Sequence, residues 1–533
     1  MEANGVNGNH SNGKTDPSSA NGSLYKKNRI LVEEIPLGLT FDDVLLMPQY
    51  SDITSRKDVS LKTRFSKNVK LNLPLVSSPM DTVTEADMAI EMARNGGIGI
   101  IHRFQSIEDQ AKMIQKVKRA EAHVIVDPIR VHKTTKLKRL RELVTLHNIN
   151  TFLVTENGEE TDGVNRSPQT KRKGSVTVPK DTLAGIITSR DLRFHKDAFE
   201  YASEIMTPRE KMVVWTGSNS DFPSPATLKA LMIQSRIEKI PIVTDKNEIV
   251  GLVTLKDILR LDSDYLANLD EEGSLIVGAA VGAKDDYLER AKALINAGCD
   301  VLVVDIANGH SALCINTVTT LKESYDIDIV AGSIATAEGA LNLIKAGADG
   351  IRCGIGNGSI CITRIVAGSG VPQLSALLDV APVCKEYNIP LISDGGNRNS
   401  GNMCKALAAG ADCIMLGRLV AGCEESPSKV IYRDGKLCKV YRGMAGYGAN
   451  ISKAQRTGDQ EPNNKTFTPE GVEGYIPYAG PLKDVLHQFE SGIKSGMSYS
   501  GARTIVDMQA KAKFIRMTSS GIHESGVHDI NKI

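Results

Sequence analysis

Short apolar runs alternate with longer amphipathic segments along most of the chain. Near the start, two apolar runs at 73–78 and 97–102 flank a segment that begins near Thr84 and ends at 95–97 with Asn-Gly-Gly. The runs have strand length, and a glycine pair after an amphipathic segment is typical of a helix end. We therefore predict a strand–helix–strand unit, which implies parallel strands because such a connection crosses over one face of a sheet.

The same alternation resumes after residue 270. Further apolar runs of strand length lie at 275–282, 301–306, 328–331, 350–354, 390–394 and 413–416. Three of them follow one repeated phrase, Ala-Gly-(Cys or Ala)-Asp, at 297–300, 346–349 and 409–412. In each phrase the glycine is expected to end a helix, and the next strand begins at once. With the first two strands this makes eight strand–helix units, which predicts an α/β fold of the (β/α)8 TIM barrel type.

Residues 123–269 break this rhythm and contain an internal repeat. The phrase I-N-T-F-L-V-T at 149–155 is similar to I-E-K-I-P-I-V-T at 237–244. The phrase G-I-I-T-S-R-D-L at 185–192 is similar to G-L-V-T-L-K-D-I at 251–258, with glycine, threonine and aspartate at the same spacing. We therefore predict two copies of one module, inserted into the barrel.

Segments without apolar periodicity complete the division of the chain. Residues 1–28 are rich in Asn, Gly and Ser and almost lack large apolar residues, which predicts a disordered tail. The polar stretch 156–180 is expected to be a loop of the first module, and the glycine-rich stretch 441–465 a mobile flap over the barrel mouth. The predicted domains are the tail 1–28, the barrel 29–122 and 270–533, and the modules 123–204 and 205–269.

Charge and cysteine content narrow the class of protein. The net charge is +1, with 64 Lys and Arg against 63 Asp and Glu, which argues against a general binder of nucleic acid or membrane surfaces. We expect no membrane span and no signal peptide, because apolar runs of the necessary length are missing. All nine cysteines lie between 299 and 438 and none forms a C-x-x-C pair, so we expect a reducing, cytoplasmic location without a disulfide or zinc framework. The final Asn-Lys-Ile is a poor relative of a peroxisomal address.

Residues with chemical potential fall just after predicted strands. The stretch G-I-R-C-G-I-G-N-G-S-I-C-I-T at 350–363 places three alternating glycines and Cys361 after one strand. Such glycines let the backbone approach a ligand and bind an anion, and a cysteine beside them can act as a nucleophile. A glycine-rich turn with a buried structural cysteine is the alternative. Other polar or glycine clusters follow strands at 78–81, 305–310, 394–396 and 417–418. Because the carboxyl ends of barrel strands share one face, we predict the active site there.

Five phrases together resemble the IMP dehydrogenase and GMP reductase family. They are S-S-P-M-D-T (77–82), G-I-G-N-G-S-I-C-I-T (354–363), D-G-G (394–396), Y-R-G-M (441–444) and P-E-G-V-E-G (469–474). The similarity extends from residue 37 to residue 529. The inserted repeat resembles a tandem cystathionine-β-synthase-type (CBS) domain pair, in the place where IMP dehydrogenases carry one. The resemblance thus implies a TIM barrel with an inserted CBS pair.

The resemblance also implies chemistry at C2 of the purine ring of GMP or IMP. Cys361 would bond covalently to this carbon, Thr363 would relay a proton, and Glu470 would lie near the substrate. Hydride would move to or from NADP or NAD. The implied substrate-binding residues are Ser78, Met80, Arg352, Ser359, Asp394, Gly395, Gly396, Gly417, Arg418, Tyr441, Gly443, Met444 and Glu470. Among them, those implied for the 5′-phosphate are Ser359, Gly396, Gly417 and Tyr441, and Asp394 would bind the ribose.

Three further sites are implied in the same way. Asp305, with Gly354 and Gly356, would face the cofactor. A potassium ion would be held by Gly356, Gly358 and Cys361, and by Glu524, Ser525 and Gly526 of a neighbouring subunit. The CBS pair would bind adenine or guanine nucleotides through Thr188, Asp191, Thr254 and Asp257. The expected assembly is a homotetramer, or an octamer through the CBS pair.

Several of these residues have plainer interpretations. Asp305 could cap the following helix, Arg352 could form only a salt bridge, and Tyr441 could be a packed aromatic residue. The four CBS residues could merely cap strand ends. Cysteines on strand or helix patterns are interpreted as small core residues rather than nucleophiles, namely Cys353, Cys384, Cys404 and Cys413.

The flap favours the reductase branch of the family. IMP dehydrogenases activate water with an Arg-Tyr pair in the flap, whereas GMP reductases rely on a Thr-Glu relay. The flap of this chain has no Arg-Tyr dipeptide, because Arg456 is followed by Thr457. Arg456 could still be a displaced equivalent. The phrases at 305–310, 372–376 and 392–396 also resemble the reductases, and Ser333 replaces an asparagine usual in both branches.

Other features favour other functions. The CBS insertion, P-E-G-V-E-G and the C-terminal E-S-G-V-H resemble IMP dehydrogenase, which stays the alternative. A third possibility is a nucleotide-sensing assembly subunit that works through the CBS pair. The presence of Cys361, Thr363 and Glu470 argues for an active enzyme.

Overall fold

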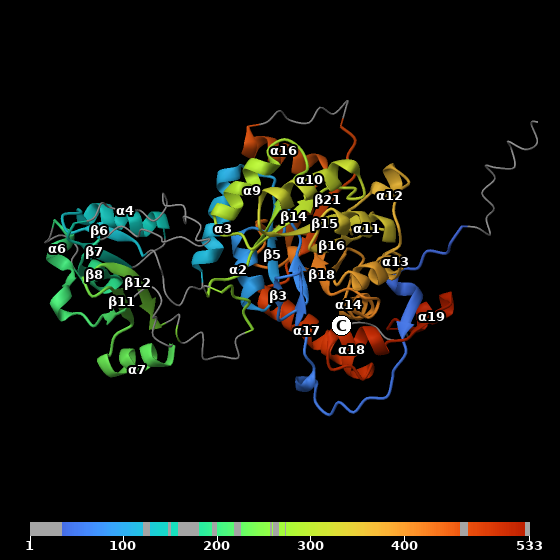
Figure 1. Cartoon of the computed structure of the whole chain (residues 1–533), viewed down its shortest axis with the longest axis horizontal. Helices are drawn as coiled ribbons and strands as arrows, with labels where there is room; N and C mark the ends of the chain where they lie inside the picture. Colours follow the sequence, from blue (N-terminus) through green and yellow to red (C-terminus); the bar gives the residue numbers. More distant parts are fainter. Residues whose placement is uncertain are drawn as a thin grey trace, which may run out of the picture. The chain divides into compact units, whose positions relative to one another are not determined.

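The structure is a computed structural model that describes residues 35–120, 128–147, 151–157, 181–194, 200–217, 225–255, 258, 266–271, 273–458 and 467–527 (Figure 1). Contacts group the chain into a short unit, Met1–Gly38, and a large unit, Leu39–Ile533. The predicted tail 1–28 and most of the predicted loop 156–180 lie outside the described residues.

Eight parallel strands close into a barrel, which confirms the predicted fold class. Their spatial order is β13-β14-β15-β16-β17-β18-β4-β5. The strands are β4 (Leu75–Ser77), β5 (Ile98–Ile101), β13 (Gly278–Val281), β14 (Val301–Asp305), β15 (Asp328–Ile334), β16 (Gly350–Cys353), β17 (Leu391–Asp394) and β18 (Cys413–Leu416). Each of them overlaps one of the eight strands predicted from the sequence.

Alternate residues of each strand belong to two different cores, as the two-residue period of a strand requires. In β14, Val301 and Val303 pack inside the barrel, whereas Leu302 and Val304 pack against the surrounding helices. Phe65 joins the interior core from a hairpin of β2 (Thr63–Arg64) and β3 (Lys70–Leu71). Figure 1 shows the helices around the strands. They are α2 (Ala86–Arg94), α3 (Ile107–Arg119), α9 (Tyr287–Asn296), α10 (Ala312–Ser324), α11 (Ala337–Lys345), α13 (Gln373–Glu386) and α14 (Ser400–Ala408).

The repeated Ala-Gly-x-Asp phrase has the role predicted for its glycine and a second role for its aspartate. Gly298, Gly347 and Gly410 have φ of +96°, +101° and +106°, which ends each helix in a conformation that favours glycine. The aspartate two residues later accepts a hydrogen bond from a backbone N at the start of the preceding strand or one residue before it, at 2.7–3.0 Å in all three cases. The phrase therefore joins each helix end to the sheet.

The insertion contains two sheets with matching register. One sheet holds β6 (Arg130–His132), β7 (Thr151–Thr155), β8 (Leu183–Thr188) and β9 (Thr207–Pro208), and the other holds β10 (Trp215–Thr216), β11 (Lys239–Val243) and β12 (Ile249–Thr254). The β7–β8 and β11–β12 ladders are antiparallel, and each shifts register at its last pair. The insertion's helices are α4 (Leu137–His147), α5 (Ser189–Phe194), α6 (Ala202–Ile205) and α7 (Pro225–Ser235). The equal ladders support two copies of one module.

The two modules share a small core, which contains Leu183 of the first and Ile249 of the second. Their boundary differs from the prediction. Strand β9 pairs with β8, so Thr207 and Pro208 belong to the first sheet and the boundary lies beyond residue 204. The prediction placed it too early because this two-residue strand carries no apolar pattern.

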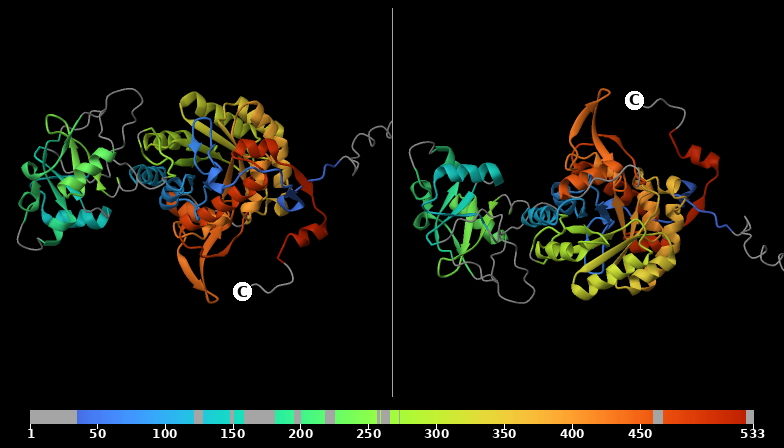
Figure 2. Two further views of the ribbon diagram at one scale, coloured as in Figure 1. Left: turned by 90° about the horizontal axis from the view of Figure 1, so that it is seen from below. Right: turned by 90° about the horizontal axis from the view of Figure 1, so that it is seen from above.

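After β18 the chain forms further elements beside the barrel. A three-stranded sheet contains β19 (Val430–Arg433), β20 (Lys436–Arg442) and β21 (Glu473–Pro477), and Figure 2 shows the β19–β20 hairpin extending outward, in orange. The stretch predicted as a flap contains a helix, α16 (Tyr447–Thr457). The remaining elements are α17 (Leu482–Tyr499), α18 (Ile505–Lys511), β22 (Phe514–Arg516), which pairs with β1 (Val44–Leu46), and α19 (Ser519–Glu524). Among the described residues, no helix has the length and apolar character needed to cross a membrane.

Candidate active site

The glycine loop after β16 packs directly against the loop after β17. Gly354 and Gly356 have φ of +150° and +78°, and a side chain at Gly354 would collide with the main-chain carbonyl of Asp394. Gly396 donates from its backbone N to the Asn357 carbonyl at 3.1 Å, which joins the two loops. Four glycines, Gly354, Gly356, Gly395 and Gly396, thus combine a positive φ with close packing of the two strand-end loops.

Cys361 lies at the end of this loop, at the start of a hydrogen-bonded chain of three side chains. Its Sγ lies 3.1 Å from the Thr363 hydroxyl, and that hydroxyl donates to Glu470 Oε2 at 2.7 Å. Cys361 is half-buried. The structure therefore brings together the three residues predicted to be catalytic, although Glu470 is 107 residues from Thr363 in sequence.

Main-chain hydrogen bonds hold this chain of side chains in place. Ile362 N donates to the Glu470 carbonyl at 2.9 Å, and Val472 N donates to the Ile360 carbonyl at 3.0 Å. Cys361 and Gly471 form an isolated antiparallel bridge between these bonds. The segment around Glu470 is therefore paired with the Cys361 loop, so carboxylate and thiol keep a fixed separation.

Arg352 joins two aspartates at the ends of neighbouring strands. Its Nη2 donates to Asp305 Oδ1 at 2.8 Å, and its Nε lies 3.7 Å from Asp394 Oδ2. The guanidinium is buried, whereas Asp305 is 20% and Asp394 27% exposed through their side chains. Burial raises the pKa of Asp394, although the positive charge of Arg352 opposes this. Asp305 does not cap helix α10, because Ser311 takes that position.

The exposed edges of these two carboxylates are suited to hydroxyl groups of a ligand. A carboxylate has more acceptor positions than one guanidinium uses, and the partial exposure of both side chains leaves oxygen surface at the barrel mouth. A ribose at each aspartate would fit these acceptors, because its hydroxyls would donate to the carboxylate oxygens. The residues thus fit the sugar groups of the implied nucleotide and cofactor, whose nicotinamide supplies hydride chemistry when bound.

A second cluster forms where β18 ends and α15 (Arg418–Ala421) begins. A Cβ atom at Gly417 would lie 2.8 Å from the Tyr441 hydroxyl, 3.4 Å from Met80 Sδ and 3.7 Å from Ser78 Oγ. Tyr441 is only 4% exposed, and burial raises its pKa to about 12 despite a hydrogen bond with Ser359. Five of the residues predicted to bind the nucleotide therefore converge here, and Tyr441 is not a packed aromatic residue alone.

Gly443 and Met444 are linked to the loop after β4 by an ion pair that the sequence analysis missed. Arg442 donates to Asp81 Oδ2 from both Nε and Nη2, the former at 2.9 Å. Asp81 N lies 3.3 Å from Met444 Sδ, and Gly443 N donates to the Val472 carbonyl at 3.0 Å. A possible signal was that both charged residues sit inside the two phrases S-S-P-M-D-T and Y-R-G-M.

Arg456 forms an ion pair with a residue at the start of helix α2. Its Nη1 donates to Glu85 Oε1 at 2.9 Å, and that oxygen also lies 3.3 Å from Nε2 of the buried His102. Burial by itself would raise the pKa of Glu85, but bonds and charge from His102 and Arg456 lower it below its ordinary value. The pair ties helix α16 to the start of α2.

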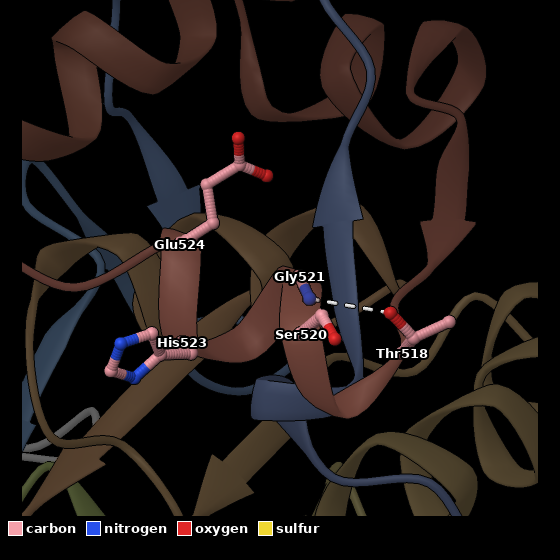
Figure 3. Close-up of a pocket in the computed structure, with 5 residues that line it drawn as sticks. All are labelled: Thr518, Ser520, Gly521, His523 and Glu524. Atoms are coloured by element: carbon pink, nitrogen blue, oxygen red, sulfur yellow. Dashed lines mark hydrogen bonds between the residues drawn. The ribbon is translucent and has the colours of Figure 1, made fainter.

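The residues predicted to complete a potassium site in a neighbouring subunit lie near the C-terminus. Glu524, Ser525 and Gly526 follow β22, and Figure 3 shows a shallow pocket of this segment whose Gly521 N donates to Thr518 Oγ1 at 3.3 Å. In that view Glu524 and His523 point away from Thr518. The described residues contain no group of three or more His, Cys, Asp or Glu side chains that could hold a metal ion.

In the insertion, Asp191 caps its own helix. Its carboxylate accepts from Thr188 N at 2.7 Å and from Thr188 Oγ1 at 2.8 Å, which is the plainer interpretation of this pair. Thr254 ends β12 at the equivalent position, and Asp257 lies outside the described residues. The cysteines predicted to be core residues are all buried, and burial raises the pKa of Cys384 and Cys404 to about 12.

Comparison with known proteins gives consistent results. The family model described as IMP dehydrogenase / GMP reductase domain matches residues 38–528. A Leishmania major protein named GMP reductase is 47% identical over 513 residues, covering 94% of this chain and 98% of the relative. An inosine-5′-monophosphate dehydrogenase from Aquifex aeolicus is 45% identical, covering 93% and 96%. A crystal structure of GMP reductase from Trypanosoma brucei in complex with guanosine 5′-monophosphate matches with a TM-score of 0.84 and 45% identity, over 94% of this chain and 99% of that one.

Proposed function

Because the chain belongs to the IMP dehydrogenase / GMP reductase family, we propose that it is a GMP reductase, which converts GMP, NADPH and a proton to IMP, ammonia and NADP. The observation that carries the proposal is the chain from Cys361 through Thr363 to Glu470. It supplies a nucleophile together with a route for the proton that must leave the thiol and reach the departing amine.

The reaction needs three proton transfers and one hydride transfer. The Cys361 thiol gives its proton through the Thr363 hydroxyl to Glu470, and Sγ forms a bond to C2 of GMP. Glu470 then returns a proton to the 2-amino group, and the C2–N bond breaks as ammonia leaves. NADPH, when bound, would supply the hydride for the new C2–H bond. The C2–S bond would break last, releasing IMP and the Cys361 thiolate, which takes up one proton from solvent to restore the thiol.

The two ends of the nucleotide are assigned to the clusters described above. The proposed phosphate site is the cluster at Gly417 and Tyr441, where main-chain amides at the start of α15 add to hydroxyl donors. The ribose hydroxyls are assigned to Asp394 and the cofactor to Asp305. Gly443 and Met444 are assigned to the purine, with Asp81 and Arg442 positioning them.

The position of Arg456 favours the reductase over the hydrolytic branch. A guanidinium that activates water must approach the carbon attached to Cys361, whereas Arg456 is held by Glu85. IMP dehydrogenase stays the second candidate, because relatives of that name are up to 45% identical.

A spectrophotometric assay at the absorbance of the reduced nicotinamide tests the branch. With GMP and NADPH we expect a loss of absorbance, because the Thr363–Glu470 pair is intact. With IMP, NAD and potassium we expect no gain, because the guanidinium of Arg456 is held by Glu85. A gain in the second mixture alone would show instead that the chain is an IMP dehydrogenase.

Replacement of Arg456 by alanine tests the same point by a different route. Loss of a catalytic base typically lowers turnover about 10²–10⁴-fold, whereas loss of an exposed ion pair has a small effect. We expect Arg456→Ala to retain GMP reduction within about tenfold of the parent, and Glu85→Gln to match it, since each removes the charge pairing between Arg456 and Glu85. A loss of more than about a hundredfold in the arginine variant alone would assign Arg456 a catalytic role.

We further propose that the inserted modules are a CBS pair that binds adenine or guanine nucleotides. The support is their matching ladders and the repeated threonine at the ends of β8 and β12. We also propose a potassium site in a homotetramer. The carbonyls of Gly356, Gly358 and Cys361 would bind the ion, and Glu524–Gly526 of a neighbouring subunit would complete the site. Thermal unfolding with and without ATP, GTP and potassium would test both sites, because a ligand that binds the folded state raises its midpoint.

A further inference from the structure

Lys439 is a charged side chain buried without a carboxylate partner. It lies on β20 and is 1% exposed. In the part of the chain that the structure describes, no Asp or Glu oxygen lies within ion-pair distance of its ammonium group. Because an unpaired buried charge is costly, its environment must replace the water that it has lost.

Four oxygen atoms of one turn surround this ammonium. Nζ donates to the carbonyls of Cys423 at 2.6 Å, Glu424 at 3.1 Å and Ser426 at 2.9 Å, and to Ser426 Oγ at 2.8 Å. Burial lowers the pKa of Lys439. The four acceptors nevertheless favour the ammonium, because its three hydrogens can serve all four when one is shared, whereas a neutral amine has only two hydrogens. Converging main-chain carbonyls are also how proteins replace the hydration shell of potassium. The turn therefore has the donor set of a monovalent-cation site.

The ammonium connects two sides of the proposed phosphate site. The turn 423–426 lies just after α15, whose N-cap is the proposed phosphate-binding residue Gly417. Ser426 Oγ donates to the Ala421 carbonyl of that helix at 2.7 Å. Lys439 itself precedes Tyr441 by two residues on β20. Residues two apart on a strand point to the same face, so displacement of Lys439 would displace the Tyr441 hydroxyl.

We propose that the Lys439 ammonium serves as a built-in monovalent cation, which fixes α15 relative to β20 and thereby positions Gly417 and Tyr441 for the nucleotide phosphate. Lys439 is thus a positioning residue that does not touch the substrate. The inference rests on the proposed function, because it takes the cluster at Gly417 as the phosphate site. It implies that removal of the lysine beyond Cβ leaves a carbonyl cage that a small ammonium ion can occupy.

Calorimetric titration of GMP into Lys439→Ala, below its unfolding temperature, tests the proposal. We expect affinity for GMP to fall at least about tenfold, because several charge-assisted bonds that fix the phosphate site are lost. Addition of propylammonium, which reproduces the missing part of the side chain, should restore most of the affinity. Tetramethylammonium at the same concentration should not, because it has no hydrogen to donate. Lys436→Ala, an exposed lysine of the same strand, should bind GMP like the parent.

Two further variants protect the test against misfolding. Lys439→Met keeps the apolar stem without the charge, and Ser426→Ala removes one of the four oxygens. We expect Lys439→Met to weaken GMP binding like Lys439→Ala, and Ser426→Ala to weaken it about threefold. Unchanged affinity for GMP in Lys439→Met would overturn the proposal. If both lysine variants fail to fold, unchanged affinity in Ser426→Ala would overturn it instead. Equal rescue of Lys439→Ala by tetramethylammonium would also overturn it. A parent protein that binds GMP without reducing it would refute the proposed function only.

Discussion

Replacement of Cys361 by alanine is expected to abolish GMP reduction while GMP still binds. The proposed reaction proceeds through a bond between Sγ and C2, and no other described side chain of the site can supply an equivalent nucleophile there. Loss of a nucleophile that works as one unit with its base removes most of the catalytic advantage, and we expect a fall of at least about 10⁴-fold in kcat. The Kd for GMP should change by less than about threefold, because the phosphate and ribose contacts do not involve the thiol.

The measurement combines absorbance loss of NADPH with calorimetric binding of GMP. Cys438→Ala is the matched control, since Cys438 is also half-buried but lies on β20 outside the chain of catalytic side chains. It should reduce GMP at the parent rate. Iodoacetamide should label Cys361 in the free enzyme, and saturating GMP should protect it. Turnover by Cys361→Ala within about tenfold of the parent would exclude covalent catalysis at this residue.

The barrel was largely predictable because local signals mark its elements. Each Ala-Gly-x-Asp phrase gives a helix end and a strand start within four residues, and the glycines have the left-handed conformation that such an end requires. Strand ends were harder to place. The strand β15 was predicted to end at Ala331, because Gly332 and Ser333 interrupt the apolar pattern. It continues to Ile334, because its backbone remains paired with β14 and β16. Apolar periodicity reports burial of side chains and not pairing of the backbone.

Helix α16 was missed for a related reason. Its buried side chains are those of two alanines, Ala449 and Ala454, so it packs through small residues and shows no strong apolar stripe. The ion pairs that fix it were equally hidden. Arg456 and Glu85 are 371 positions apart in sequence, and Arg442 and Asp81 are 361 apart. A single sequence shows which residues are charged but not which distant charges meet.

The functional residues were predictable to the extent that they sit in phrases shared by a family. Cys361, Thr363 and Glu470 were named from such phrases, and the structure adds the distances that turn three residues into one hydrogen-bonded chain. Lys439 belongs to no such phrase. Its four oxygen partners are mainly backbone carbonyls, which every residue has, so nothing in the sequence distinguishes this lysine from its exposed neighbour Lys436.

Replacement of Glu470 by glutamine is expected to give the second largest loss of activity. The amide keeps the size of the side chain but cannot store the thiol proton, so kcat should fall about 10²–10⁴-fold. Binding of GMP should be affected much less, because Glu470 bonds to Thr363 through Oε2. Glu473→Gln, an exposed carboxylate of the adjoining strand β21, is the matched control and should retain the parent rate.

The double variant Thr363→Val, Glu470→Gln distinguishes a relay from two independent contributions. If the hydroxyl and the carboxylate carry one proton, either single change interrupts the path, and the double variant should be no slower than the worse single variant by more than about threefold. Stopped-flow absorbance of NADPH, with enzyme in excess over GMP, would measure this without interference from product release. If the losses of the two single variants multiply in the double variant, Thr363 and Glu470 act separately. Another group near Cys361 would then have to accept the thiol proton.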